Sequence, residues 1–306
     1  MEQRFFKTGT PVHIYQHSAD WGVIFYDDIH ILSHFTLLCT TARQYGVKIY
    51  ALCYMLNHLH ILAEFISREQ MTKFLRFATS VFSHNYNLYM GKEGANFAPR
   101  FGASFKSGSK SVVSTFNYIV NNPVEKHLVA RALDYRWNFL VYAPSGPALK
   151  CNQSKRKSSL QFQLISNQIE LMIQSNTHIS VEYLANIKSL LSPAEWQVIV
   201  NKIIAGYNII DYQRMASYFR SMDDMLKAPD FNTGAEYELD DESMPHKPYF
   251  TMLNRIKKST PLHSFRPWAM STDETLEWIR DLSGLPGVTP AHLKGILHID
   301  KTAPAF

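Results

Sequence analysis

Cysteine is scarce in this sequence, which has Cys39, Cys53 and Cys151 as its three cysteines among 306 residues. Their spacing matches neither the even disulfide framework of a small secreted protein nor a metal-binding cysteine pair. Both of these classes are therefore excluded. We expect the three thiols to be packing residues in a protein that works in a reducing compartment, the cytoplasm.

Long apolar stretches are missing too. No run approaches the roughly 18 apolar residues that are needed to span a bilayer, and residues 1–7 lack the apolar core of an export signal. We therefore expect no membrane contact. The content of 46% hydrophobic and 13% aromatic residues is still ample for packed cores, and the length predicts two domains.

Acidic residues are outnumbered by basic ones in one half of the chain only. Residues 1–150 hold 15 Lys and Arg against 9 Asp and Glu, a balance of +6, whereas residues 151–306 hold 16 against 17, a balance of −1. A basic half suits a polyanionic ligand, because neutralising each phosphate releases counterions. The excess is moderate, so it indicates a nucleic-acid ligand only together with a motif.

Two histidines stand out in residues 54–62, which read YMLNHLHIL. Side chains alternate along a strand, so His58 and His60 point to one face and can hold a divalent metal. The opposite face is wholly apolar, and its burial fixes the register. With 13 histidines in the chain, roughly every second sequence of this composition would contain such a pair by chance. A half-exposed pair of strand histidines is the alternative.

A second informative stretch is residues 117–124, which read NYIVNNPV. Tyr118 and Asn122 are four residues apart, so on a helix they share one face about 5–6 Å apart at Cβ. Pro123 disfavours helical geometry at the preceding residue, which predicts that the helix ends at Asn122. We expect Tyr118 to be a nucleophile and Asn122 a third metal ligand. The alternative for Asn122 is a side chain that caps the local backbone.

These motifs occur in a fixed order with a third one, Tyr135-Arg136-Trp137. Together they resemble the single-tyrosine HUH transposases, and in particular the branch of REP-associated tyrosine transposases. The resemblance also covers residues 13–16, 24–28, 100–101 and 105–106, so it runs from about residue 10 to about 142. Leu56 departs from the family pattern, which often has proline before the Asn-His pair, but this affects a turn and not a ligand.

The resemblance implies an enzyme, a transposase that cleaves and rejoins single-stranded or hairpin DNA. Tyr118 would attack a phosphodiester and form a 5′-phosphotyrosine, which a second 3′ hydroxyl can displace to rejoin strands. His58, His60 and Asn122 would hold the metal, and one amide oxygen with two nitrogens suits Mg²⁺ or Mn²⁺ better than Zn²⁺. Such a protein is expected in the bacterial cytoplasm, associated with the nucleoid when it is bound to DNA.

The order of elements predicts the fold. Asp27 and Asp28 precede a helix that Gly46 ends, and Ser67 and Gln70 form a capping box for a second helix. The remaining elements are strands at residues 10–17, 47–55 and 58–65, a short strand near Phe105 and a helix at residues 111–122. This order predicts an α+β class with a ferredoxin-like antiparallel sheet and packed helices, which the resemblance also implies.

Four basic residues are candidates for contacts with DNA. Arg76 lies on the polar face of the second helix, and Arg100, Lys106 and Lys110 lie in or beside the Gly- and Ser-rich connection of residues 91–110. The functional interpretation of the connection, with Arg100, Lys106 and Lys110, is a cradle for backbone phosphates. The alternative is an ordinary solvated surface.

The second half has a different character. We predict a catalytic domain at residues 1–145, a linker at 146–159 and a mainly helical domain at 160–306, with capping boxes that begin at Ser192 and Ser271. Residues 232–248 read as an acidic exposed loop. The two helices at 271–299 resemble a helix-turn-helix whose second helix offers His292, Lys294 and His298 to a groove. A helical hairpin that merely packs is the alternative.

Two other classes of protein stay open. One is a domesticated protein that binds hairpin DNA or RNA without cutting it. The other is a rolling-circle replication initiator or a relaxase, which shares the His-x-His and tyrosine chemistry. The Tyr-x-x-x-Asn-Pro string favours the transposase. The sequence leaves open the DNA target and its hairpin, a monomer or a homodimer, and whether the tyrosine acts in its own subunit.

Overall fold

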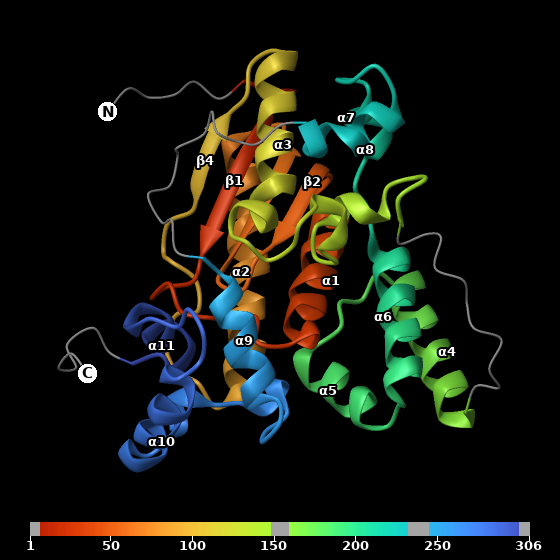
Figure 1. Cartoon of the computed structure of the whole chain (residues 1–306). Coiled ribbons are helices and arrows are strands. Elements are labelled where there is room, and N and C mark those ends of the chain that lie inside the picture. The colour runs from red at the N-terminus through yellow and green to blue at the C-terminus, as the bar shows by residue number, and fades with distance from the viewer. Residues whose placement is uncertain (1–6, 148–158, 232–244, 300–306) are drawn as a thin grey trace.

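A four-stranded antiparallel sheet forms the centre of the N-terminal half (Figure 1). The computed structural model describes residues 7–147, 159–231 and 245–299. The strands, in the spatial order β2-β3-β1-β4, are β1 (Pro11–His17), β2 (Lys48–Tyr54), β3 (His58–Glu64) and β4 (Gly102–Phe105). Every neighbouring pair is antiparallel. This is the predicted ferredoxin-like α+β fold, and the prediction is confirmed.

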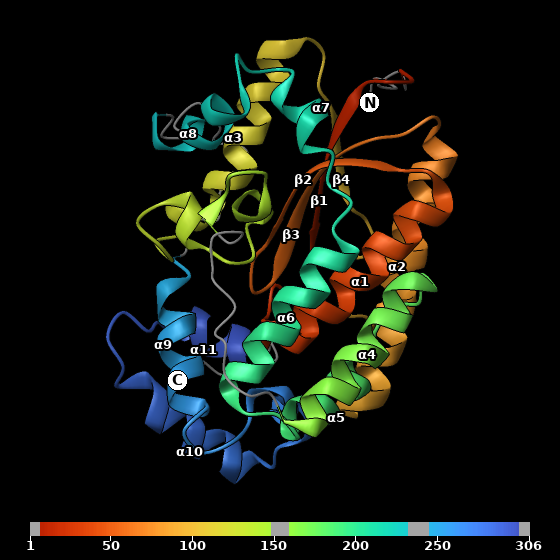
Figure 2. The same cartoon turned by 90° about the vertical axis from the view of Figure 1, so that its right-hand side faces the viewer.

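The two faces of the sheet are covered by different helices. Helices α1 (Asp28–Tyr45) and α2 (Arg68–Met90) lie on one face, and α3 (Ser109–Glu125) lies on the other (Figure 2). Alternate residues of β3 accordingly belong to two hydrophobic clusters, with Leu59 and Ile61 beside α1 and α2, and Leu62 beside α3. Side chains two or four residues apart on a strand point to the same face. His58 and His60 therefore lie on the same face as Leu62, toward α3.

The ends of α1 and α2 follow from local side chains. Asp27 caps α1 by accepting a hydrogen bond from the Ile29 amide, and α1 ends at Gly46, which has φ of 66°. Ser67 caps α2 by accepting from the Gln70 amide. The second hydrogen bond of the predicted capping box, from the Ser67 amide to the Gln70 side chain, is wrong. The Gln70 side chain instead accepts from the Ile66 amide and donates to the Tyr45 carbonyl. It thereby ties α2 to the end of α1.

The predicted end of α3 at Asn122 is also wrong. The helix continues to Glu125 with Pro123 inside it. The amide of Lys126 donates to the Asn122 carbonyl at 3.0 Å, and that of Leu128 to the Pro123 carbonyl at 2.9 Å. Pro123 is buried, so packing of this last turn against the protein outweighs the local preference that the sequence expresses.

The second half is helical, as predicted, in the ranges that the structure describes. The helices are α4 (Leu160–Gln174), α5 (Val181–Ser189), α6 (Pro193–Tyr207), α7 (Tyr212–Ala216), α8 (Met222–Phe231), α9 (Lys247–Ile256), α10 (Thr272–Ser283) and α11 (Pro290–Leu297). Short 3-10 turns are η1 (Ala132–Asp134), η2 (Phe139–Tyr142), η4 (Leu262–Ser264) and η5 (Pro267–Ala269). The predicted capping boxes at Ser192 and Ser271 are confirmed.

The C-terminal helices pack directly on the sheet and its helices. Helices α5 and α6 contact α1, and α9, α10 and α11 share a hydrophobic cluster with Val23, Tyr26 and Leu56. Most of the predicted linker at 146–159 and of the acidic loop at 232–248 lies outside the described residues. Within the described ranges, no helix is long and apolar enough to cross a membrane.

Helices α10 and α11 occupy the segment predicted as a helix-turn-helix. His292 is buried on α11, with its Nε2 2.9 Å from the Pro245 carbonyl oxygen, and His298 pairs with Asp20. Both histidines that the sequence offered to a groove are thus engaged within the protein. Cys39 and Cys53 are buried and free, as expected of packing residues, whereas Cys151 lies outside the described residues.

Gly22 tests the contact between α11 and the sheet domain. A Cβ atom at Gly22 would lie 2.7 Å from His298 Cε1 and 2.9 Å from the Gly295 carbonyl oxygen, so Gly22→Ala should lower the free energy of unfolding by about 1–3 kcal/mol. Gly284→Ala is the control, because nothing lies within 4 Å of its Cβ position. Urea denaturation that finds both variants equally stable would contradict the contact.

Candidate active site

The structure brings together the four residues predicted for metal binding and catalysis. The Nε2 atom of His58 lies 3.3 Å from Asn122 Oδ1, and that of His60 lies 3.2 Å from Asn122 Nδ2. The ring of Tyr118 stands edge-on to that of His60 with 5.4 Å between centroids. All four side chains are buried. The Asn122 side chain therefore contacts both histidines, as a ligand would, and does not act as the helix cap that was the alternative.

Sequence reasoning missed His13. Its Nε2 lies 3.0 Å from His60 Nδ1, and its ring stacks on that of His60 and stands edge-on to that of Tyr118. Burial and, to a lesser extent, the charge of Lys106 lower the pKa of His13 to about 3, so the ring is neutral. The sequence held a signal for His13. Side chains alternate along β1, which puts His13 and Tyr15 on one face of the strand, and this is the face of the sheet that carries His58 and His60.

Asn57 fixes the tautomer of His58. The side-chain nitrogen of Asn57 donates to the Trp21 carbonyl at 3.0 Å, which orients the amide so that its oxygen faces His58 Nδ1 at 2.7 Å. An amide oxygen only accepts, so the Nδ1 atom of His58 carries the proton. A neutral His58 therefore presents the lone pair of Nε2 toward Asn122.

Both candidate ligand imidazoles are neutral. Burial is the main reason that the pKa of His58 and the pKa of His60 lie well below the ordinary value, and the ammonium of Lys126 adds to the effect in each case. Neutral imidazole is the form that binds metal ions. Lys126 was also missed from the sequence, although it follows Asn122 by four residues at the end of α3.

The donor atoms of the site suit a divalent cation. The Asn122 amide lies 3.3 Å from the bare Nε2 of His58 and 3.2 Å from His60 Nε2, so two imidazole nitrogens and an amide lie side by side. Neutral imidazole and amide oxygen both bind divalent ions through their lone pairs. The residues thus fit a metal ion.

The described part of the chain adds no acidic or histidine side chain to His58 and His60 in a metal-binding arrangement. Among the residues that the structure describes, no group of three or more His, Cys, Asp or Glu side chains is arranged to hold a metal ion. With two histidines as the ionisable ligands, the amide oxygen of Asn122 or water has to complete the coordination.

The four basic candidates do not gather at this site. Lys106 is buried and acts on His13. Arg76 is exposed on α2, and α2 covers the opposite face of the sheet from α3 (Figure 2). Arg100 precedes β4 and Lys110 lies in the first turn of α3, and both are exposed. Arg76 therefore lies apart from α3, and the phosphate cradle of Arg100, Lys106 and Lys110 stays a prediction, as does the contact of all four residues with DNA.

Comparison with known proteins finds a match in the N-terminal half. Residues 24–122 match the family model of transposases described as IS200 like. The matched segment contains His58, His60 and Tyr118 and ends at Asn122, so the resemblance inferred from the motifs is confirmed for it. Transposase-like DNA processing is the function that this match supports.

The helices from α4 onward lie outside the matched transposase segment. A solved structure described as "Structure of the REP associates tyrosine transposase bound to a REP hairpin" is similar to the chain at 14% sequence identity and a TM-score of 0.42, covering 52% of this chain and 94% of that chain. No curated protein matches the chain.

Asn122→Ala tests whether the amide is a ligand. Removing an amide that contacts both histidines should raise the dissociation constant for Mn²⁺, measured by calorimetry, by about 10–100-fold. Asn121→Ala is a matched control at the preceding residue, because the Asn121 side chain donates to the Pro229 carbonyl and not to the histidines. An unchanged Mn²⁺ affinity in Asn122→Ala would remove Asn122 from the ligand set.

Proposed function

We propose that the protein is a single-strand DNA endonuclease and strand transferase of the HUH tyrosine type, from the REP-associated branch of the transposases. The observation that carries this proposal is the position of Tyr118, one helical turn before Asn122 and edge-on to His60. A phenol beside two neutral imidazoles and an amide oxygen is the arrangement that a metal-assisted attack on a phosphodiester requires.

Each of the four site residues has its own role in the proposed reaction. The hydroxyl oxygen of Tyr118 forms a bond to phosphorus while the bond to the 3′ oxygen breaks, so the protein becomes attached to the 5′ phosphate. The phenol gives up its proton and the departing 3′ oxygen takes one up. His58, His60 and Asn122 would hold Mg²⁺ or Mn²⁺, which when bound polarises the phosphate. A second 3′ hydroxyl then reverses the step and rejoins strands without ATP.

The electrostatics of the site support a phosphate ligand. Lys126 acts on both candidate ligand histidines and Lys106 acts on His13, so two ammonium groups from different elements raise the local positive potential. The site residues are buried, which favours a flexible single strand or the unpaired flank of a hairpin over a regular duplex.

Three broader predictions belong to this proposal. The catalytic domain spans residues 1–145, a linker spans 146–159 and the helical domain spans 160–306. The helix pair at 271–299 has His292 and His298 engaged within the protein, which favours a packed helical hairpin over the helix-turn-helix. The protein works in the bacterial cytoplasm and associates with the nucleoid when DNA is bound. Monomeric and homodimeric forms are both compatible with the site.

Tyr118→Phe should abolish the covalent protein–DNA adduct while leaving hairpin binding near the wild-type level, because the phenyl ring keeps its packing but has no nucleophile. Denaturing gels detect the adduct and fluorescence anisotropy measures the binding. Tyr135→Phe is the control, since the hydroxyl of this buried tyrosine has no hydrogen-bond partner among the described residues. Adduct at the wild-type level in Tyr118→Phe would exclude Tyr118 as the nucleophile.

His58→Ala and His60→Ala should each lose cleavage, and EDTA should have the same effect on the unmodified protein. His34→Gln serves as a buried-histidine control, because His34 lies on α1 and pairs with Tyr54 away from the site. Cleavage that survives chelation would contradict the metal requirement. Hairpin binding without any cleavage by the unmodified protein would instead identify a binding protein.

A further inference from the structure

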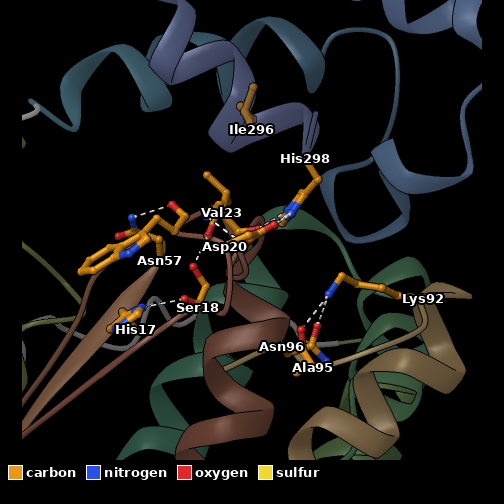
Figure 3. Close-up of polar contacts among 12 residues, drawn as sticks. His17, Ser18, Asp20, Val23, Asn57, Lys92, Ala95, Asn96, Ile296 and His298 are labelled. Carbon is orange, nitrogen blue, oxygen red and sulfur yellow. Dashed lines mark hydrogen bonds and ion pairs between the residues drawn. The ribbon is translucent and has the colours of Figure 1, made fainter. Parts of the chain in front are cut away.

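Residues 18–23, which follow β1, form a loop that lies between α11 on one side and the turn before His58 on the other (Figure 3). On the side of the turn, the Ser18 amide donates to the Asn57 carbonyl at 2.8 Å, and the amides of Ile24 and Phe25 both donate to the Leu56 carbonyl at 3.0 Å. The loop and the two residues that follow it are therefore joined to the turn by three backbone hydrogen bonds.

Helix α11 holds the same loop from its other side. The ring of His298 lies between two acceptors, with Nδ1 2.5 Å from the Asp20 carboxylate and Nε2 2.8 Å from the Val23 carbonyl oxygen (Figure 3). The Val23 amide donates to the Gly295 carbonyl at 2.8 Å. Gly22 lies so close that a side chain there would collide with His298.

The contacts of His298 require both of its ring nitrogens to donate. A carboxylate and a carbonyl oxygen only accept, so each of these two contacts is a hydrogen bond when the ring nitrogen that faces the oxygen carries a proton. Burial raises the pKa of Asp20, but the hydrogen bond and the charge of His298 outweigh it and hold the pKa below its usual range. Asp20 and His298 thus form an ion pair that fixes the loop to α11.

Trp21, at the centre of the loop, has a backbone that needs such support. Its φ is 63°, a left-handed conformation that bulky residues adopt only when their surroundings hold them. Its indole stacks on the His17 ring at 3.8 Å, and its carbonyl accepts the hydrogen bond from Asn57. Releasing the loop from α11 would allow the Trp21 peptide to relax and would remove this acceptor.

We propose that His298 is a positioning residue for His58. It acts through the loop, the Trp21 carbonyl and the Asn57 side chain, and so keeps the proton of His58 on Nδ1 and the lone pair of Nε2 directed at Asn122. The consequence for metal binding rests on the proposed function. The C-terminal helical region, which lies outside the transposase match, is thereby an integral part of the active site.

The orientation of His58 can be measured without metal. In protein labelled with ¹⁵N-histidine, ring ¹H–¹⁵N spectra should show His58 as a single Nδ1–H tautomer, and His58→Ala assigns its signals. Asn57→Ala and His298→Ala should each replace that pattern by tautomers in exchange. His84→Ala is the control, because His84 is exposed on α2. A His58 signal that stays fixed in His298→Ala, while the backbone amide spectrum is that of the folded protein, would overturn the proposal.

A double-mutant cycle on Mn²⁺ affinity separates positioning from a general structural effect. Asn57→Ala and His298→Ala should each weaken Mn²⁺ binding about tenfold, as expected for groups that orient a ligand. The double variant should also lose about tenfold, because both act on one path. A loss of about 100-fold would mean independent effects and would overturn the proposal.

Asp20→Asn is the second variant if His298→Ala does not fold. It keeps the size of the side chain and removes the charge that pairs with His298, so it should shift the His58 tautomer and the Mn²⁺ affinity in the same direction. Unchanged values for both in Asp20→Asn would count against the proposal. Wild-type protein that binds no Mn²⁺ would refute the proposed function, whereas the tautomer measurement would still decide the role of His298.

Discussion

The alternation of side chains along β3 is the constraint on which the rest of the site depends. Leu59 and Ile61 are buried against α1 and α2, and their burial cannot be kept if the strand slips by one residue. His58 and His60 are therefore held toward α3 by the hydrophobic core on the opposite face. Any helix that packs over them then places its own side chains next to two imidazoles, and α3 places Tyr118 and Asn122 there.

Burial has a chemical consequence at this position. It keeps both imidazoles neutral, and the contact with Asn57 leaves the lone pair of His58 Nε2 directed at Asn122. Neutral imidazole is the form that binds metal ions. Folding thus places two imidazoles in the form that a divalent ion requires next to an amide that can also bind it.

The sequence predicted features that depend on local pattern. Period two along β3, the caps of α1 and α6 and the i, i+4 relation of Tyr118 and Asn122 follow from residues close together in the chain. It did not predict the end of α3, where packing of Pro123 prevails, or the contacts of His13. The ion pair of Asp20 with His298 also escaped, because it joins two segments that only the folded chain brings together.

The central claim is that the buried donor set binds a divalent metal ion. Anomalous diffraction from crystals loaded with Mn²⁺ would test it most directly. The account predicts a peak within about 2.1–2.3 Å of His58 Nε2, His60 Nε2 and Asn122 Oδ1, the range of bonds between such ions and their ligands. A map without a peak at this position, at a Mn²⁺ concentration that supports DNA cleavage, would contradict it.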